Sequence, residues 1–329
     1  MLKVTYFYRE TRKTGLSIEG IFHAVKKFLE GKADIKEFYC DASISRLQNT
    51  LKAKKYGNDI NHITGDVNFL ALGLRGKKNI LTIHDLGHYD TLKNRSYLNY
   101  IIYKIFWYKL PLKYISIVTV ISEFTKSKLI ERFNFPEDRI RVIHDPVKPI
   151  FRFKKKEKLN AVPRILQIGS GKHKNLDNLI EAVKGLNVHL DIIAWIDDAV
   201  IRKLKSNNIS YNIYNALSEE DLYEKYVDSD ILYFASFYEG FGMPIIEAQA
   251  VGRPVITSNF GAMKEVAGNS ALLVDPNNVE EIRSAIQQLI KDTHLYEELV
   301  AKGKENILKY DCNKIASDYL SVYNELARG

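Results

Sequence analysis

Short apolar runs alternate with amphipathic segments along most of the chain. In the first half, β-rich runs lie near residues 1–9, 35–39, 62–64, 79–83, 116–121 and 141–143. Between them, apolar residues recur every three or four positions, as at Ile18, Ile21, Phe22 and Val25, which is the period of a helix. Strands that alternate with helices over short connections predict a parallel sheet with helices packed on it.

A second series of the same kind follows residue 163. Its strands are expected at 164–168, 190–195, 231–234, 254–257 and 271–274, and its helices near 176–184, 279–291, 295–309 and 312–327. Between the two series, Pro146, Pro149, Pro163 and the charged run 154–158 are typical of a linker. We therefore predict two α/β domains, residues 1–148 and 149–329, with the last helix (about 312–327) packing back on the first domain.

Length and composition agree with this division. The 329 residues are 46% hydrophobic and 27% charged, which suits two globular domains rather than a disordered chain. Two cysteines in separate regions, Cys40 and Cys312, make a disulfide framework or a cysteine-rich metal site implausible. The N-terminus does not resemble a signal peptide, and no stretch holds 18 uncharged apolar residues, so we expect a cytoplasmic protein.

The positive charge is concentrated in the first half. Residues 1–150 hold 26 Lys and Arg against 15 Asp and Glu, a balance of +11, whereas residues 151–329 hold 22 against 25, a balance of −3. Such a surface suits anionic lipid, an acidic acceptor or nucleic acid. Because no nucleic-acid-binding module is recognisable, we do not expect nucleic acid as a partner.

Ligands of parallel sheets bind at the carboxyl ends of the strands. In the first domain this rule points to the turn after Tyr8, which includes Gly15, and to Asp66, His84 and Asp85. His84 could contact a substrate, act as a general base, or be a turn residue bonded to Asp85.

The most distinctive stretch of the second domain is Glu239-Gly240-Phe241-Gly242-Met243-Pro244-Ile245-Ile246-Glu247. It follows an apolar run and precedes a short helix that ends near Gly252. Two glycines permit a tight turn, and proline suits the first position of a helix. The two carboxylates either complement the helix dipole or accept hydrogen bonds from the hydroxyls of a nucleotide sugar.

A second loop with ligand-binding character is Gly169-Ser170-Gly171-Lys172-His173-Lys174-Asn175. It follows a strand and opens a helix, so its amides and Lys172 or Lys174 are placed to bind a diphosphate. Its glycines fit neither a Walker A loop nor the dinucleotide fingerprint. The alternative is a pair of solvated lysines.

Two further stretches allow a structural and a functional interpretation. Asp228-Ser229-Asp230 has the D-x-D pattern of some metal-dependent sugar transferases, but its place between a helix and a strand favours turn residues. Residues 93–115 combine many aromatic residues with lysines and arginines, which is typical of an interfacial membrane helix. For this helix we prefer a core position, with its basic face at a membrane and these residues facing inward: Leu98, Ile102, Ile105 and Phe106.

Several stretches together resemble the retaining glycosyltransferases of family 4, and the mannosyltransferase-like members in particular. The most specific is residues 239–255, which is similar to the family's E-x7-E signature and the A-x-G-x-P-V that follows it. Segments 82–86, 120–126, 217–226 and 274–276 also follow the family pattern, as do Asp230, Gly268, Gly169 and the Lys174-Asn175 pair. The resemblance implies the GT-B fold, in which two Rossmann-like parallel-sheet domains face each other across a cleft.

The resemblance also implies roles. Glu239 would contact the transferred sugar, Glu247 the ribose, Lys174 the diphosphate, and His84 the sugar ring from the opposing domain. The family often has Arg where this chain has Ser170, so phosphate binding falls on Lys174 with help from Lys172. Segment 144–147 likewise replaces a common Asn-Gly-Val at the hinge.

We therefore predict a metal-independent retaining hexosyltransferase that needs no cofactor. It would move a hexose, mannose for example, from a GDP- or UDP-linked donor to a glycan or lipid-linked glycan in surface polysaccharide or glycoconjugate biosynthesis. The catalytic residues would be Glu239, His84 and Lys174. The remaining donor-binding residues would be Gly169, Ser170, Lys172, Gly240, Phe241, Gly242, Met243 and Glu247, and the acceptor side would comprise Gly15, Asp66, His84 and Asp85.

Peripheral contact with the inner face of an anionic membrane is expected through the N-terminal domain. Alternatives are an epimerase or a phosphorylase of the same fold, and a non-catalytic protein that binds nucleotide sugars.

Overall fold

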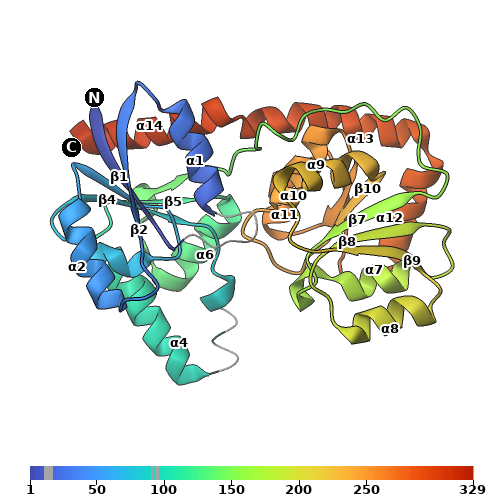
Figure 1. Ribbon diagram of the computed structural model, residues 1–329, viewed down its shortest axis with the longest axis horizontal. Helices are drawn as coiled ribbons and strands as arrows, with labels where there is room; N and C mark the ends of the chain where they lie inside the picture. The colour runs from blue at the N-terminus through green and yellow to red at the C-terminus, as the bar shows by residue number, and fades with distance from the viewer. Residues whose placement is uncertain (11–17, 90–91, 93–95, 329) are drawn as a thin grey trace. The chain divides into compact units, whose positions relative to one another are not determined.

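The computed structural model describes residues 1–10, 18–89, 92 and 96–328 (Figure 1). It divides into two compact units, Met1–Pro146 together with Cys312–Gly329, and Val147–Asp311. Each unit contains a six-stranded sheet whose paired strands are all parallel. The predicted α/β class with two parallel sheets is confirmed. Gly15 lies outside the described residues.

The sheet of the first unit has the strand order β2-β1-β3-β4-β5-β6. Its strands are β1 (Leu2–Tyr8), β2 (Ala33–Tyr39), β3 (Ile60–Ile63), β4 (Lys78–Ile83), β5 (Ile117–Val120) and β6 (Ile140–Val142). The helical segments between them are α1 (Ile18–Phe28), α2 (Arg46–Tyr56), η1 (Asn68–Leu72), α4 (Tyr97–Tyr103), η2 (Lys104–Lys109), α5 (Leu110–Leu112), α6 (Glu123–Phe133) and η3 (Glu137–Arg139).

Both faces of this sheet are covered. Successive side chains of a strand point to opposite faces, so Phe7 joins one apolar core and its neighbours Tyr6 and Tyr8 join the other. Such burial on both faces explains why the strands are almost continuously apolar.

The C-terminal helix α14 (Cys312–Arg328) packs in this unit, against α1 (Figure 1). Tyr323 donates to the hydroxyl of Tyr6 at 2.9 Å and lies 2.8 Å from Nδ1 of His62. Burial lowers the pKa of His62 to about 3, so this histidine is a neutral residue of the core. The buried hydrogen bonds tie the last segment of the chain to the first strand.

The helix at residues 97–109 differs from the prediction. Four apolar side chains that were expected to face inward are exposed: Leu98 (68%), Ile102 (47%), Ile105 (36%) and Phe106 (54%). The core position is taken instead by Trp107 and Tyr108, in the π-helical segment η2. The helix is apolar around most of its circumference, so spacing alone could not identify its covered face.

The second unit has a sheet of order β12-β11-β10-β7-β8-β9. Its strands are β7 (Arg164–Ile168), β8 (His189–Ile193), β9 (Ser210–Tyr214), β10 (Ile231–Phe234), β11 (Val255–Ser258) and β12 (Leu272–Val274). The helical segments are η4 (Lys172–Lys174), α7 (Leu176–Ala182), α8 (Asp198–Ser206), α9 (Glu219–Asp228), α10 (Met243–Val251), α11 (Gly261–Ala267), α12 (Val279–Lys291), α13 (Thr293–Asn306) and η5 (Ile307–Tyr310).

Candidate functional site

The two loops singled out in the second unit follow adjacent central strands. β7 and β10 are paired, and the sheet grows from them in opposite directions, through β8 and β9 on one side and through β11 and β12 on the other. In parallel α/β sheets this switch point, outside the carboxyl ends of the strands, is where ligands bind. The loop at 169–175 follows β7, and the loop that holds the first signature glutamate follows β10.

Backbone geometry and buried hydrogen bonds hold the loop at 169–175 in place. Gly169 has a φ of +90°, which favours glycine. A Cβ at this position would lie 2.9 Å from Cγ of Lys174, so a side chain here would clash with the lysine side chain. Asn175 has a left-handed φ of +59°, and its amide donates to the carbonyl oxygens of Ala235 and Pro276 at 3.0 and 2.8 Å. The end of the loop is therefore fixed beside β10.

The loop after β10 turns sharply into α10. Gly242, with a φ of +114°, precedes the helix, and Pro244 is its second residue. Phe241 is buried, with its ring centroid 5.5 Å from that of Tyr310. This anchor leaves Glu239, two residues earlier, half-buried at the carboxyl end of the sheet.

Lys174 and Glu239 meet at this point. Nζ of Lys174 donates to Oε1 of Glu239 at 2.6 Å, and the same ammonium lies 4.9 Å from the ring centroid of Phe234. The two charged side chains are 21% and 16% exposed. A cation and a carboxylate from separate motifs are thus paired where solvent and a ligand can still reach them.

Glu247 is deeper. Its side chain is fully buried, and Tyr226 donates to Oε2 at 2.8 Å. Oε1 has no hydrogen-bond partner among the described residues, and a buried unsatisfied group costs about 1–3 kcal/mol. Burial raises the pKa of Glu247 to about 7, against the lowering effects of the Tyr226 bond and of the charge on Lys148, while Glu219 adds to the rise.

The other donor-side candidates lie around this pair in varied environments. The hydroxyl of Ser170 donates to the carbonyl of Trp195. Lys172 is exposed, Gly240 is partly buried, and Met243 is the partly buried first residue of α10. Of the predicted donor-side residues, Lys174 and Glu239 are the two that a side-chain ion pair joins.

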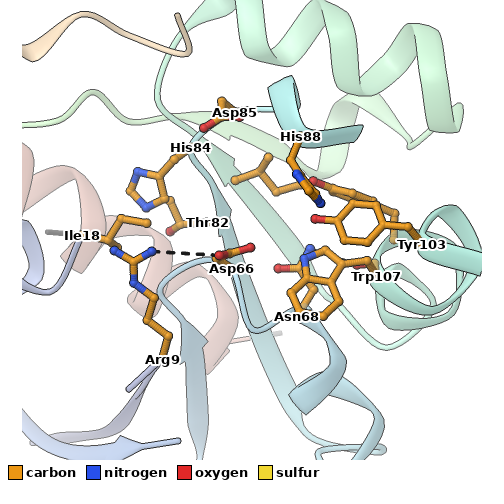
Figure 2. Close-up of a pocket in the computed structure, with 12 residues that line it drawn as sticks. Arg9, Ile18, Asp66, Asn68, Thr82, His84, Asp85, His88, Tyr103 and Trp107 are labelled. Carbon is orange, nitrogen blue, oxygen red and sulfur yellow. Dashed lines mark hydrogen bonds and ion pairs between the residues drawn. The ribbon is translucent and has the colours of Figure 1, made fainter. Parts of the chain in front are cut away.

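The first unit contains a cavity of about 170 Å³ at the carboxyl ends of β1, β3 and β4. Three predicted acceptor-side residues line it, namely Asp66, His84 and Asp85 (Figure 2). The other lining residues are Arg9, Ile18, Asn68, Thr82, Ile83, His88, Tyr103, Trp107 and Tyr108.

His84 is held between two acceptors. Its Nε2 lies 2.8 Å from the carbonyl oxygen of Thr64, and its Nδ1 lies 3.8 Å from Oδ2 of Asp145. Burial lowers the pKa of His84, but the hydrogen bond and charge of Asp145, the Thr64 carbonyl and the charge of Asp85 together raise it above its ordinary value of 6.5. Both ring nitrogens therefore face acceptors, which favours the protonated form of the ring. Gly65 gives it room, because a Cβ there would lie 2.8 Å from its Cδ2.

Arg9 and Asp66 approach each other in the same cavity (Figure 2). Nη1 of Arg9 lies 4.0 Å from Oδ2 of Asp66, while Nε donates to Glu19 at 2.9 Å. Asp66 has a left-handed φ of +50° in the turn that follows β3. The strand-end rule pointed to both turns, the one after Tyr8 and the one at Asp66, but it did not single out Arg9 or its approach to Asp66.

The aromatic wall of the cavity was not predicted. Tyr103 and Trp107 stack with centroids 5.3 Å apart, and they lie across the cavity from His84 (Figure 2). The sequence signal was the aromatic run at 97–108, which does not tell which rings face inward. An aromatic wall opposite a few polar groups is the usual lining of a small-molecule site.

The buried aspartate of the D-x-D pattern, Asp230, has a structural role. Asp230 is buried, and its carboxylate accepts from the backbone N–H of Arg164 at 2.7 Å and from the side-chain amide of Asn160, also at 2.7 Å. Nζ of Lys156 adds an ion pair at 3.0 Å. Among the described residues, His, Cys, Asp and Glu form no group of three or more that could hold a metal ion.

The fold is that of the GT-B glycosyltransferases. Models of two families match consecutive parts of the chain, Glycosyltransferase Family 4 at residues 13–149 and Glycosyl transferases group 1 at residues 150–306. The chain belongs to the family 4 glycosyltransferases. This family is retaining and generally metal-independent.

The proteins that are similar to this chain include two mannosyltransferases. The chain is 29% identical over 236 residues to the O-antigen chain mannosyltransferase B of Escherichia coli, a match over 64% of this chain and 61% of the relative. It is 25% identical over 244 residues to the O-antigen chain mannosyltransferase RfbU of Salmonella typhimurium, over 70% and 65% respectively. The chain therefore spans less than two-thirds of the length of these relatives.

A solved structure agrees over the whole chain. HepE of Anabaena, in complex with UDP and glucose, matches with a TM-score of 0.79 at 14% identity, over 99% of this chain and 100% of that one. At this identity the likeness shows the fold.

Proposed function

We propose that this protein transfers a hexose, with mannose as the first candidate, from a nucleoside diphosphate sugar to a glycan or lipid-linked glycan. The observation that carries the proposal is the 2.6 Å ion pair between Lys174 and Glu239, which joins two motifs 65 residues apart at the switch point of the second sheet. The names of the two mannosyltransferase relatives support mannose.

The donor's diphosphate would replace Glu239 as the partner of Lys174. A charge-assisted hydrogen bond to the phosphate stabilises the negative charge that develops on the leaving group. Glu239, released from the lysine, can then accept hydrogen bonds from the hydroxyls of the sugar. The ion pair keeps both charges compensated until the donor arrives.

Glu247 would hold the ribose. Its Oε1 lacks a hydrogen-bond partner among the described residues, while Oε2 is fixed by Tyr226. A ribose hydroxyl that donates to Oε1 would satisfy this oxygen. Because such a bond favours the ionised carboxylate, donor binding would lower the pKa of Glu247 and release a proton near neutral pH.

The acceptor would bind in the cavity of the first unit. Asp66 and Asp85 provide carboxylates for its hydroxyls, and Tyr103 and Trp107 provide an apolar wall. His84, whose pKa Asp145 helps to raise, adds a polar contact for the oxygen atoms of a bound sugar.

Retention of the configuration at the anomeric carbon requires no nucleophile from the protein in this scheme. The acceptor hydroxyl attacks the anomeric carbon on the face from which the diphosphate leaves, and a phosphate oxygen takes the acceptor's proton. The chain's part is to bind, to orient and to compensate charge.

A thermal-shift panel of GDP- and UDP-linked hexoses tests the proposal. A ligand at 100 times its Kd stabilises a protein by about 2.7 kcal/mol, so the true donor should stand out. Lys174→Ala should lose most of this shift, whereas Lys205→Ala, at an exposed position on α8 of the same unit, should keep it.

Product analysis with the selected donor completes the test. The expected product is a glycoside that keeps the anomeric configuration of the donor. Absence of any stabilising donor, or conversion of the sugar without an acceptor, would contradict the proposal and favour a different chemistry on the same fold.

A further inference from the structure

The outer side of the helix at 97–109 is apolar. Leu98, Ile102 and Phe106 are each about half exposed or more, Ile105 is 36% exposed, and Tyr97 precedes them at 70%. Residues spaced by three or four positions lie along one side of a helix. On a surface helix of a globular protein this side normally carries polar and charged residues.

The inner side already makes the contacts that the fold needs. Trp107 and Tyr108 are buried, and Tyr103 and Trp107 line the cavity of the first unit. The exposed apolar residues are therefore not required for packing within the described unit. A patch of this kind marks an interaction surface.

The charge of the surrounding segment has one sign. Residues 96–115 contain three lysines, Lys104, Lys109 and Lys113, and no Asp or Glu. The neighbouring α2 also lacks acidic residues, and its Arg46 lies 4.9 Å from the ring centroid of Trp107. The next residue, Leu47, is 69% exposed.

We propose that the helix at 97–109 docks on an anionic lipid surface, with Leu98, Ile102 and Phe106 among the headgroups and Lys109 and Lys113 beside lipid phosphates. An interfacial helix combines an apolar face with lysines in this way. Within the described part of the chain, no helix has the length and apolar character to cross a bilayer, so this helix lies on the surface rather than spanning it.

The charge favours lipid over a second copy of the chain. Two copies joined through this helix would bring lysines against lysines with no acidic residue of the segment to neutralise them. Anionic headgroups supply the missing negative charge.

Docking would bring the acceptor to the cavity. One helix carries the apolar surface on its outer side and the cavity wall on its inner side, and a helix with its side chains is about 10–12 Å across. The cavity would then lie about one helix diameter from the headgroups, where a lipid-linked glycan presents its sugars. This last step rests on the proposed function, whereas the docking itself does not.

Vesicle flotation tests the docking without any assay of activity. The wild-type protein should float with vesicles of phosphatidylethanolamine and phosphatidylglycerol and bind weakly to vesicles of phosphatidylcholine alone, with binding to the anionic vesicles reduced at high salt. The triple variant Leu98→Ser, Ile102→Ser, Phe106→Ser should bind the anionic vesicles at least about tenfold more weakly, because it removes the apolar area that would be buried.

Two controls separate docking from unfolding and from loss of the donor site. Leu308→Ser changes a leucine of the second unit that is 69% exposed and should bind vesicles as the wild type does. The triple variant should keep the wild-type melting temperature and the full thermal shift with the donor. A wild-type protein that floats with anionic vesicles but shows no shift with any donor would argue against the proposed function rather than against docking.

Three results would overturn the docking proposal. They are a wild-type protein that does not float with anionic vesicles, a triple variant that floats equally well, and a stable wild-type dimer that the triple variant abolishes. The last would identify a second copy of the chain as the occupant of this surface.

Discussion

The two strand-end sites hold their cations in different ways. In the second unit, Lys174 has one carboxylate partner, Glu239, and the two side chains are 21% and 16% exposed. In the first unit, His84 is enclosed between the Thr64 carbonyl and Asp145, and the exposed fractions of His84 and Asp145 are 12% and 5%. The lysine pair can open when an anion competes for it, whereas the histidine pair is a fixed part of its cavity wall.

A buried carboxyl in the second unit sharpens this difference. Glu247 is as enclosed as any group of the first unit's cavity, but one of its oxygens lacks a partner among the described residues. The second unit therefore combines an exchangeable pair with an incompletely bonded carboxyl. Both features are expected where a ligand completes the hydrogen bonding.

The largest expected effect concerns Glu247 and pH. The folded protein holds this proton up to a pH of about 7, whereas an unfolded chain releases it near 4.5. Between these values the folded state binds more protons, so the free energy of unfolding falls as pH rises, by roughly 3 kcal/mol at 1.36 kcal/mol per pKa unit. Chemical denaturation at several pH values between 4.5 and 7 measures this fall in the free energy of unfolding.

Glu247→Gln isolates that contribution. Glutamine keeps an acceptor for Tyr226 but cannot titrate, so the variant should gain stability relative to the wild type as pH rises from 4.5 to 7. Comparing the two proteins at each pH removes the opposite contribution of His62, whose folded pKa is lowered to about 3. Parallel pH curves for the two proteins would mean that Glu247 is ionised throughout.

The next effect concerns the exchangeable pair. Lys174→Ala removes a charge-assisted hydrogen bond that the proposal gives to the diphosphate, which is worth roughly 1.5–3 kcal/mol, or about 10- to 150-fold in kcat/KM. Steady-state kinetics with the donor found in the thermal-shift panel measures this loss. Lys205→Ala serves as the matched control. A folded Lys174→Ala protein with unchanged kcat/KM would rule out the role of this lysine.

A smaller effect is expected at the fixed pair. Because the pKa of His84 is raised, its pairing with Asp145 stabilises the fold fully below pH 6.5 and loses this effect as pH rises through the higher folded pKa. Asp145→Asn should lower the free energy of unfolding by about 1–2 kcal/mol at pH 6 and by less at high pH. Asp85→Asn, at an exposed neighbour, should change it less. Equal losses for Asp145→Asn at both pH values would show that the charge of His84 does not change between them, against the expected titration.

Much of the secondary structure could be predicted because local patterns coincide with tertiary packing. The helix expected at 279–291 is α12 with the same bounds, and Ser122 caps α6 by accepting from the N–H of Thr125 at 3.0 Å. Edge elements gave weaker signals. The edge strand β9 (Ser210–Tyr214) has no fully buried residue, so its apolar residues do not form the continuous run of a central strand.

The sequence predicted the individual loops of the candidate sites, but not the contacts between segments. The sequence identified the loops of Lys174 and Glu239 and the strand end at His84. It did not pair Arg9 with Asp66, nor bring Trp107 to the same cavity, since these residues lie on segments that are far apart in the sequence. At 97–109 the local pattern gave the wrong face, because a helix that is apolar on both sides does not encode which side is covered.

The last prediction is that removal of metal ions leaves kcat/KM unchanged. The carboxylate of Asp230, the last residue of the D-x-D pattern, accepts hydrogen bonds from three N–H groups and pairs with Lys156, so neither oxygen is left for a cation. Excess chelator should leave kcat/KM unchanged within error. Asp230→Asn should instead lower the melting temperature, because Lys156, 12% exposed, loses its counterion. The contradicting result would be that a chelator abolishes transfer and a divalent ion restores it. Metal rather than Lys174 would then compensate the charge on the leaving diphosphate. In that case the difference between the exchangeable lysine pair and the fixed histidine pair would have no catalytic meaning.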